Sequence, residues 1–164
     1  MNEQRLPYVF RYEPQLQDIE QVRTLAESTG NFYPEEIVVA VQLVQEAVEH
    51  GAASGYQFVF ADGPSGCHGY ACFGHIPLTR SSYDLYWIVV GRAWQRQGLG
   101  RSLLEAVERR VRAAGGTQLF IDTSGRDQYQ ATRRFYEAQG YQQAAILPDF
   151  YAPGDPKIIY SKKL

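Results

Sequence analysis

A run of apolar residues followed by two closely spaced glycines constrains the fold of this chain more than any other feature. Residues 85–90 are all aromatic or aliphatic, which favours a strand buried on both faces. After Gly98 and Gly100 the apolar positions follow the period of an α-helix, and the residues that share its face are Leu103, Leu104, Val107, Val111 and Ala114. The sequence therefore predicts a strand, a glycine-bearing turn and a helix N-terminus in succession.

This turn is suited to a phosphate-containing ligand. Backbone N–H groups point out of the first turn of a helix, and the helix dipole favours negative charge there. Glycine at positions 98 and 100 removes Cβ atoms that would keep a pyrophosphate away, and Arg96 and Arg101 add positive charge. A tight connection without a ligand is the alternative. The third glycine of a dinucleotide-binding fingerprint and the Gly-Lys-Ser/Thr of a Walker A loop are both absent.

Size and composition restrict the remaining possibilities. The 164 residues predict one domain, residues 1–164, and the formal net charge of −2 gives no electrostatic argument for a nucleic-acid partner. Residues 1–30 lack a signal-peptide pattern, and no run is apolar over the ~18 residues of a membrane span, so we expect no membrane partner. Cys67 and Cys72 have no companions at metal-ligand spacing, which predicts reduced thiols, a cytoplasmic protein and no metal.

Hydrophobic periodicity predicts the other elements. Before the apolar run we expect a strand over 8–12, helices over 16–30 and 34–51, a flexible joint over 51–55, and a β-hairpin of 56–61 and 67–76. After the turn we expect a helix over 101–114, a strand over 119–122, and a helix capped by Asp127 on which Ala131, Phe135 and Ala138 share a face. Two last strands, 141–147 and 157–162, flank a loop over 148–156.

Two short motifs resemble the hallmarks of the GNAT superfamily of N-acetyltransferases. Residues 95–100, Gln-Arg-Gln-Gly-Leu-Gly, match Gln/Arg-x-x-Gly-x-Gly/Ala, and residues 135–141, Phe-Tyr-Glu-Ala-Gln-Gly-Tyr, match Phe/Leu-Tyr-Glu-x-x-Gly-Phe/Tyr. Their separation and the order of the elements around them are typical of the family. The resemblance implies a mixed α/β fold of the GNAT type, with a mostly antiparallel central sheet that splays between its fourth and fifth strands and with four main helices.

The resemblance also implies acetyl-coenzyme A as the donor of an acetyl group. By position, Ile88 and Val90 would bind the pantetheine arm through their backbone groups, and the Ile88 N–H would polarise the thioester carbonyl. Tyr129 stands where many members carry a cofactor-binding asparagine, and Arg133 and Arg134 are candidates for the coenzyme phosphates. The residues whose N–H groups would bind the pyrophosphate are Gln95, Arg96, Gln97, Gly98, Leu99, Gly100 and Arg101.

Tyr136 matches the tyrosine that many members of the family use as a general acid. A phenol with an ordinary pKa of ~10 is a weak acid of the right range, and a thiolate leaves more readily once it is protonated. An aromatic side chain packed beside Phe135 is the alternative role. We therefore expect Tyr136 to protonate the departing thiolate.

A general base is also needed, because an alkylammonium with a pKa of ~10.4 is almost entirely protonated at pH 7. Many members of the family use a glutamate on the fourth strand, and Tyr86 occupies that position here. Asp84, two residues earlier on the same strand face, is the first candidate, and His75 is the second. Glu49 and His50 are weaker candidates, for which a solvated surface role is the alternative.

The acceptor site implied by the resemblance lies between the link that joins the first two helices and the last strand-to-strand loop. Aromatic walls with acidic groups suit a small cationic amine through cation–π and charge contacts. Simple turns at the two aspartates of the loop are the alternative. The residues in question are Phe32 and Tyr33 in the link, and Asp149, Phe150, Tyr151 and Asp155 in the loop.

The sequence thus predicts an N-acetyltransferase that moves the acetyl group of acetyl-coenzyme A to a primary amine. A compact chain without an added recognition domain favours a small-molecule acceptor, with a homodimer as one possible assembly. The alternatives are a non-catalytic sensor of coenzyme A and an acetyltransferase that acts on a protein lysine or N-terminus. A nucleotide-binding domain of another kind is a more distant alternative.

Overall fold

A computed structural model describes residues 7–164 as a mixed α/β fold with seven strands and four α-helices. The strand order is β1-β2-β3-β4-β5-β7-β6, with β4 parallel to β5 and most other neighbours antiparallel, which confirms the predicted fold class. No helix among these residues is long and apolar enough to cross a membrane. The elements are β1 (Val9–Arg11), α1 (Asp18–Thr29), α2 (Pro34–His50), β2 (Gln57–Gly63), β3 (Gly66–His75), β4 (Ser82–Val90), α3 (Leu99–Ala113), β5 (Gln118–Ser124), α4 (Gln130–Ala138), β6 (Gln142–Ala152) and β7 (Asp155–Lys163).

The chain divides into two compact units. The first contains the residues up to Phe73 together with Trp87–Val107, and the second contains Gly74–Tyr86 and Glu108–Leu164. Three elements, β3, β4 and α3, therefore begin in one unit and end in the other.

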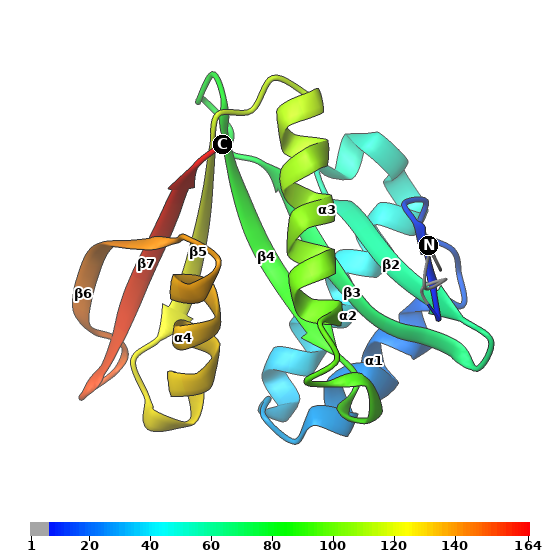
Figure 1. Ribbon diagram of the computed structural model, residues 1–164, viewed down its shortest axis with the longest axis horizontal. Coiled ribbons are helices and arrows are strands. Elements are labelled where there is room, and N and C mark those ends of the chain that lie inside the picture. The colour runs from blue at the N-terminus through cyan, green and yellow to red at the C-terminus, as the bar shows by residue number, and fades with distance from the viewer. Residues whose placement is uncertain (1–6) are drawn as a thin grey trace, which may run out of the picture. The chain divides into compact units, whose positions relative to one another are not determined.

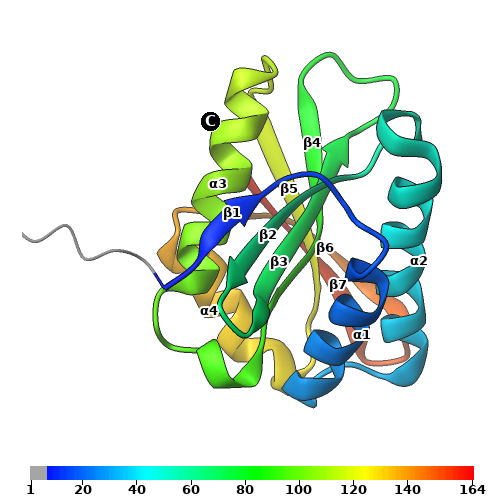
Figure 2. The ribbon, with the colours of Figure 1, turned by 90° about the vertical axis from the view of Figure 1, so that its right-hand side faces the viewer.

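In the first unit, α1 and α2 cover one face of β2 and β3, and the start of α3 covers the other (Figure 2). On the α3 side, a Cβ at Gly69 would lie 3.3 Å from side-chain atoms of both Leu99 and Leu103, so glycine allows the helix to approach the strand closely. Burial on both faces explains the uninterrupted apolar run of β2. On the side of α1 and α2, the buried cluster includes Val22, Leu25, Val41, Val44, Phe58, Phe60, Tyr70 and Cys72.

A network of ion pairs holds β1 against this core. The Arg11 guanidinium donates to both carboxylate oxygens of Asp18 at 2.8 Å, and its Nε lies 2.6 Å from Asp62 Oδ2. Asp18 is fully buried and also accepts a hydrogen bond from the Gln15 N–H at 2.7 Å. The side chain of Arg11 therefore fixes this three-residue strand to both α1 and β2.

In the second unit, α4 lies beside β5 and β7 (Figure 1). Along these strands buried residues such as Leu119 and Ile121 alternate with the half-buried Phe120 and the exposed Asp122, so one face is apolar and the other carries charge. The parallel ladder between β4 and β5 ends at Leu85 and Ile121, whereas β5 continues to pair with β7 as far as Ser124.

Strands β6 and β7 extend through the segment that was predicted as a loop, and only a turn at residues 153–154 separates them. Their pairing passes from Leu147–Lys157 to Ala152–Asp155, so residues 148–151 form a bulge. Asp149 adopts a φ of 53° and accepts a hydrogen bond from the Gly154 N–H at 2.7 Å. The prediction of a loop was wrong because the bulge absorbs the proline and aspartate that normally interrupt a strand.

The predicted buried face of α4 was also wrong. Ala131 and Ala138 are exposed, and Tyr136 is the buried residue of this helix. The hydrogen bonds of Arg133 explain the orientation of α4. Its Nη1 donates to the backbone carbonyls of Ser124 and Arg126, which precede the helix, at 2.8 and 2.9 Å. An inward-facing arginine that satisfies backbone acceptors has no signature in a pattern of apolar residues.

Two predictions at helix boundaries also differ from the structure. Residues Gly51–Ser54 form a 3₁₀ helix instead of a flexible joint. Asp127 begins another 3₁₀ segment, and Tyr129, not Asp127, precedes the first residue of α4.

Candidate active site

The turn between β4 and α3 presents backbone donors at the start of the helix. Arg96 and Gly98 adopt φ values of 60° and 83°. Hydrogen bonding within α3 starts with the Ser102 N–H, which donates to the Gly98 carbonyl at 3.1 Å, so the N–H groups of residues 99–101 have no acceptor inside the helix. They lie at the positive end of the helix dipole and can bind an anionic group. A Cβ at Gly98 would meet no described atom within 4 Å, so its φ, not crowding, explains the glycine.

Two glutamines of the first motif brace this turn. Gln95 Nε2 donates to the Val90 carbonyl at 3.1 Å, and Gln97 Nε2 donates to the Ala93 carbonyl at 3.0 Å. Gln95 thereby ties the turn back to the last residue of β4. A loop that is fixed in advance loses less conformational entropy when it binds a ligand.

The other predicted coenzyme residues in this segment differ in their surroundings. Ile88 and Val90 are half-buried on β4. Arg96 is exposed, whereas Arg101 Nε forms an ion pair with Glu105 at 2.8 Å and so extends along the helix. Arg96 is therefore the better placed of the two arginines to contact a phosphate.

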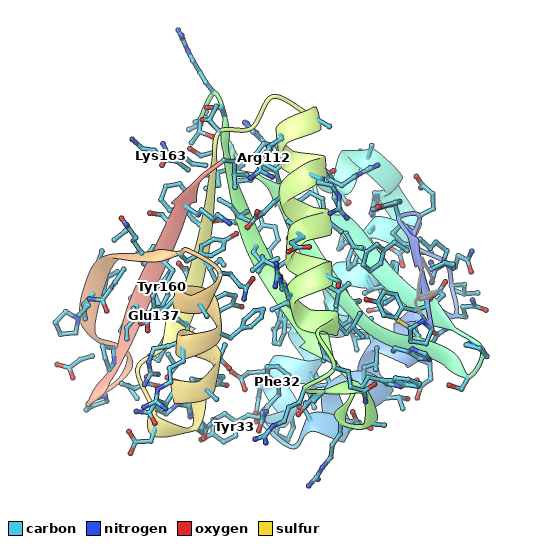
Figure 3. All side chains as sticks on the ribbon, in the orientation of Figure 1. Phe32, Tyr33, Arg112, Glu137, Tyr160 and Lys163 are labelled. Carbon is cyan, nitrogen blue, oxygen red and sulfur yellow. The ribbon has the colours of Figure 1, made fainter. Side chains whose placement is uncertain are left out.

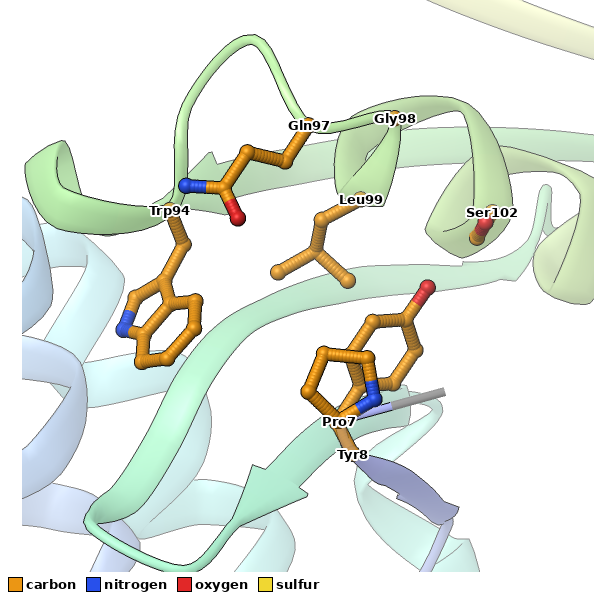
Figure 4. A pocket seen from close by; sticks show the side chains of 7 residues that line it. All are labelled: Pro7, Tyr8, Trp94, Gln97, Gly98, Leu99 and Ser102. Carbon is orange, nitrogen blue, oxygen red and sulfur yellow. The ribbon is translucent and has the colours of Figure 1, made fainter. Parts of the chain in front are cut away.

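A pocket of ≈ 120 Å³ lies beside the turn (Figure 4). Trp94, on one side of it, stacks on the buried ring of His68 with 3.5 Å between the ring centroids. Burial lowers the pKa of His68, which keeps that ring neutral. The sequence did not indicate this pocket, because two of its lining residues, Pro7 and Tyr8, come from the N-terminal segment and belong to no motif. Its lining is formed by Pro7, Tyr8, Trp94, Gln97, Gly98, Leu99 and Ser102.

Tyr136 lies in an aromatic cluster of the second unit. Its side chain is 4% exposed, and its ring centroid lies 5.4 Å from that of Phe135, 6.0 Å from that of Tyr141 and 6.2 Å from that of Tyr160. Burial raises the pKa of Tyr136 above its usual range, so the hydroxyl is protonated at neutral pH. The phenol therefore carries a proton that it can donate, and the raised pKa makes it a weaker acid than a solvated tyrosine.

Two carboxylates hold the neighbouring tyrosines. The Tyr160 hydroxyl donates to Glu137 Oε1 at 2.8 Å, and Figure 3 labels both residues. Glu108 Oε1 accepts from the Tyr141 hydroxyl at 3.0 Å and from Lys162 Nζ at 2.9 Å. Glu108 is only 5% exposed, and these charged and polar partners compensate for its burial. The rings against which Tyr136 packs are therefore fixed at their hydroxyl ends.

Asp84 on β4 and Asp122 on β5 form an acidic pair on one face of these two neighbouring strands. Burial and the charge of Asp122 raise the pKa of Asp84 above its ordinary range, while the charge of Lys157 lowers it. Lys157 Nζ lies 2.5 Å from Asp122 Oδ2. Tyr86, two residues beyond Asp84, is 38% exposed. Sequence reasoning singled out Asp84 and Tyr86 but missed Asp122 and Lys157, which reach this face only through the pairing of β5 with its neighbours.

The other candidate bases have the surroundings of packed or surface residues. The His75 ring contacts the edge of the buried Tyr83 ring, with 5.3 Å between centroids. His50 Nδ1 lies 3.2 Å from Glu46 Oε2, and Glu49 is exposed. Asp84 is thus the base candidate with the most strongly perturbed environment.

The first unit contains the predicted acceptor residues of the α1–α2 link. The Phe32 ring meets that of Trp87 edge-on at 5.1 Å between centroids. Tyr33 precedes the first residue of α2, and its N–H donates to Glu36 Oε2 at 2.7 Å. The Tyr33 side chain is 51% exposed.

The bulge of β6 in the second unit carries the remaining acceptor residues. Phe150 and Tyr151 are about half exposed, and their rings meet edge-on at 5.0 Å. Asp149 holds the bulge through its bond from the Gly154 N–H. Asp155, by contrast, is buried and lies 3.1 Å from Arg126 Nε, so it stabilises the fold instead of offering a free carboxylate.

Three residues near the start of α4 are the other candidates for a coenzyme contact. Arg133 is used to satisfy backbone carbonyls, and the Arg126 guanidinium lies 5.3 Å from the centroid of the Tyr129 ring. Arg134 is exposed and remains accessible to a ligand phosphate.

The fold and the strand–turn–helix site define an α/β protein whose turn presents backbone N–H groups at the start of a helix, and comparison with known proteins identifies its class. The family model of the acetyltransferase (GNAT) domain matches residues 53–143, more than half of the chain. The chain therefore belongs to the GNAT family of acetyltransferases.

Solved structures share this fold. A protein from Desulfovibrio desulfuricans that is assigned to the GNAT acetyltransferase family is 49% identical, with 95% of this chain and 98% of that chain covered and a TM-score of 0.92. An aminoglycoside 6'-N-acetyltransferase in complex with coenzyme A has 20% identity, a TM-score of 0.76 and coverages of 94% and 96%. The ribosomal-protein-S18-alanine N-acetyltransferase from Escherichia coli has 19% identity, a TM-score of 0.72 and coverages of 94% and 94%. The last two likenesses concern the fold alone. Comparison with curated proteins gives no match.

Proposed function

We propose that this protein transfers the acetyl group of acetyl-coenzyme A to the primary amine of a small molecule. Membership of the GNAT family supports acetyl transfer. The coenzyme A bound by an aminoglycoside acetyltransferase of the same fold supports the identity of the donor. The observation that carries the proposal is Tyr136, a buried and protonated phenol within the second family motif.

The turn between β4 and α3 is assigned to the pyrophosphate of the donor. The unpaired N–H groups of residues 99–101 and the exposed Arg96 support this assignment, because both supply positive charge at one helix end. Backbone groups of Ile88 and Val90 are assigned to the pantetheine arm. The Ile88 N–H would then stabilise negative charge on the thioester oxygen.

The proposed reaction begins when the acceptor ammonium loses a proton to Asp84. The free amine nitrogen attacks the thioester carbonyl carbon, so that a C–N bond forms and the carbonyl becomes an oxyanion. The C–S bond then breaks, and Tyr136 protonates the departing thiolate. The nitrogen loses its second proton through Asp84 to solvent, and solvent reprotonates Tyr136. One proton is released for each amide formed.

The acceptor is assigned to the acidic and aromatic face of the second unit. Asp84 and Asp122 provide negative charge there, and the exposed rings of Phe150 and Tyr151 provide surfaces that attract a cation. Phe32 and Tyr33 stay predicted acceptor contacts. A small amine that is positively charged at neutral pH fits this chemistry better than an anionic one.

The test measures release of the coenzyme A thiol with cationic, neutral and anionic amines and with peptides. We expect turnover of cationic amines, and Tyr136→Phe should lower kcat about 10²–10⁴-fold with little change in either KM. Tyr160→Phe is the control, because it removes a hydroxyl from the same aromatic cluster.

Three outcomes contradict parts of the proposal. Unchanged turnover in Tyr136→Phe removes the general-acid role. Binding of coenzyme A without thiol release for any acceptor indicates a sensor. Turnover of peptides alone indicates a protein acetyltransferase.

A further inference from the structure

The acidic face already contains an ammonium group of the protein itself. Lys157 Nζ lies 2.5 Å from Asp122 Oδ2 and 4.5 Å from the centroid of the Phe150 ring. A carboxylate and the face of an aromatic ring are together the groups that recognise an alkylammonium. The Lys157 side chain is 18% exposed, so its ammonium is held between these two partners rather than extended into solvent.

The bulge of β6 places Phe150 over Lys157. Lys157 pairs with Leu147, immediately before the bulge, and the next pair is Ala152–Asp155. The left-handed backbone of Asp149 and its bond from Gly154 fix the shape of the bulge. The ring is therefore part of a built arrangement, although Phe150 itself is half exposed.

The remaining carboxylates of this region are committed elsewhere. Asp155 pairs with Arg126, and Asp149 accepts the hydrogen bond that holds the bulge. An acceptor with two ammonium groups would bind the first beside Asp84, the proposed base. The second ammonium would then bind between Asp122 and Phe150. That second place is the one that Lys157 fills.

We propose that Lys157 is a built-in competitor for the acceptor, and that a second ammonium group of the acceptor binds between Asp122 and Phe150 only by displacing it. This inference rests on the proposed function. It makes Lys157 a specificity-determining residue: its ammonium weakens the binding of diamines, which need its place, more than the binding of monoamines, which feel only its charge near Asp84. The lysine thus biases the enzyme toward acceptors with one positive charge.

The experiment compares KM for diaminobutane, diaminopentane and a monoamine of similar length in three variants. Lys157→Met removes the ammonium and keeps an apolar stem, and Lys157→Arg keeps the positive charge. Lys163→Met removes an exposed lysine at the end of the same strand (Figure 3) and is the matched control. In Lys157→Met we expect KM for the diamines to fall about tenfold, and the monoamine KM to fall by a clearly smaller factor, because the monoamine loses only the repulsion of a nearby charge. Lys157→Arg and Lys163→Met should resemble the wild type.

Calorimetric titration of each variant with diaminopentane, in the absence of acetyl-coenzyme A, gives a readout that does not depend on turnover. Tighter binding by Lys157→Met supports the inference. An unchanged or weaker diamine affinity in a folded Lys157→Met overturns it, because Lys157 would then assist the acceptor instead of competing with it. Failure of the wild type to release thiol with any amine would contradict the proposed function and leave the titration as an independent test.

Discussion

Asp84 is held in a setting that opposes its ionisation, because it is half-buried and lies near the charge of Asp122. Such a carboxylate accepts a proton more readily than a solvated one does, which suits a general base. The same setting carries a cost in stability. Because the folded-state pKa lies above the unfolded one, protonated Asp84 favours the native state at low pH, and this contribution is lost as the pH rises through the folded-state pKa.

The variant Asp84→Asn should therefore change activity and stability in opposite directions. We expect kcat/KM for the amine to fall about 10²–10⁴-fold, and the rise of kcat/KM with pH that reports Asp84 to disappear. Urea unfolding should show Asp84→Asn to be more stable than the wild type at about pH 8, with the difference vanishing near pH 3, below the ordinary aspartate pKa of ~3.9.

The control for this prediction is Asp127→Asn, because Asp127 is exposed. It should not show the gain in stability that is expected of Asp84→Asn at about pH 8. A loss of stability in Asp84→Asn at neutral pH would instead mean that attraction to Lys157 outweighs the burial of Asp84.

Among the elements, the turn and α3 could be predicted from the sequence. A change of hydrophobic period and two glycines mark the junction directly in the sequence, and the helix begins at Leu99, within two residues of the prediction. The bulge of β6 and the orientation of α4 could not be predicted in this way. They depend on Asp149 and Arg133, whose hydrogen bonds reach residues on neighbouring segments.

The variant Gly98→Ala tests the role of the turn as an element. A φ of 83° costs an L-residue about 1–2 kcal/mol, and no neighbouring atom adds a clash. We expect this loss of stability, together with a several-fold higher KM for acetyl-coenzyme A and an unchanged KM for the amine. Gly30→Ala, at the end of α1 with a φ of 68° and open space around its Cβ, should cost similar stability without affecting either KM. Equal KM changes in both variants would argue against pyrophosphate binding at the turn.

At the scale of the whole molecule, coenzyme A should stabilise the native state. At about 100 times its Kd, a ligand that binds only the folded protein adds about 2.7 kcal/mol. For a chain of 164 residues this corresponds to a rise of roughly 5 to 10 °C in Tm. Pantetheine, which lacks the pyrophosphate, should produce a much smaller shift in a thermal unfolding experiment. Equal shifts for the two ligands would place the main binding contacts outside the turn.

The candidate site divides into a part that sequence can indicate and a part that only the folded chain assembles. The turn and Tyr136 lie in contiguous motifs, so their residue types and spacing can be recognised directly. Asp122 and Lys157 stand 35 positions apart, from 122 to 157. Only the pairing of β5 with β7 brings their side chains together. Strand register of this kind is set by the whole sheet, which is why the acidic face could be predicted only in its Asp84 and Tyr86 portion.

The stacking of Trp94 on the neutral ring of His68 has an optical consequence. The chain has two tryptophans, and both Trp87 and Trp94 lie on the segment that runs from β4 into the turn. Tryptophan fluorescence therefore comes entirely from the segment that is assigned to binding acetyl-coenzyme A. The protein carries its own fluorescent reporter at that position, and coenzyme binding can be followed in the unlabelled chain.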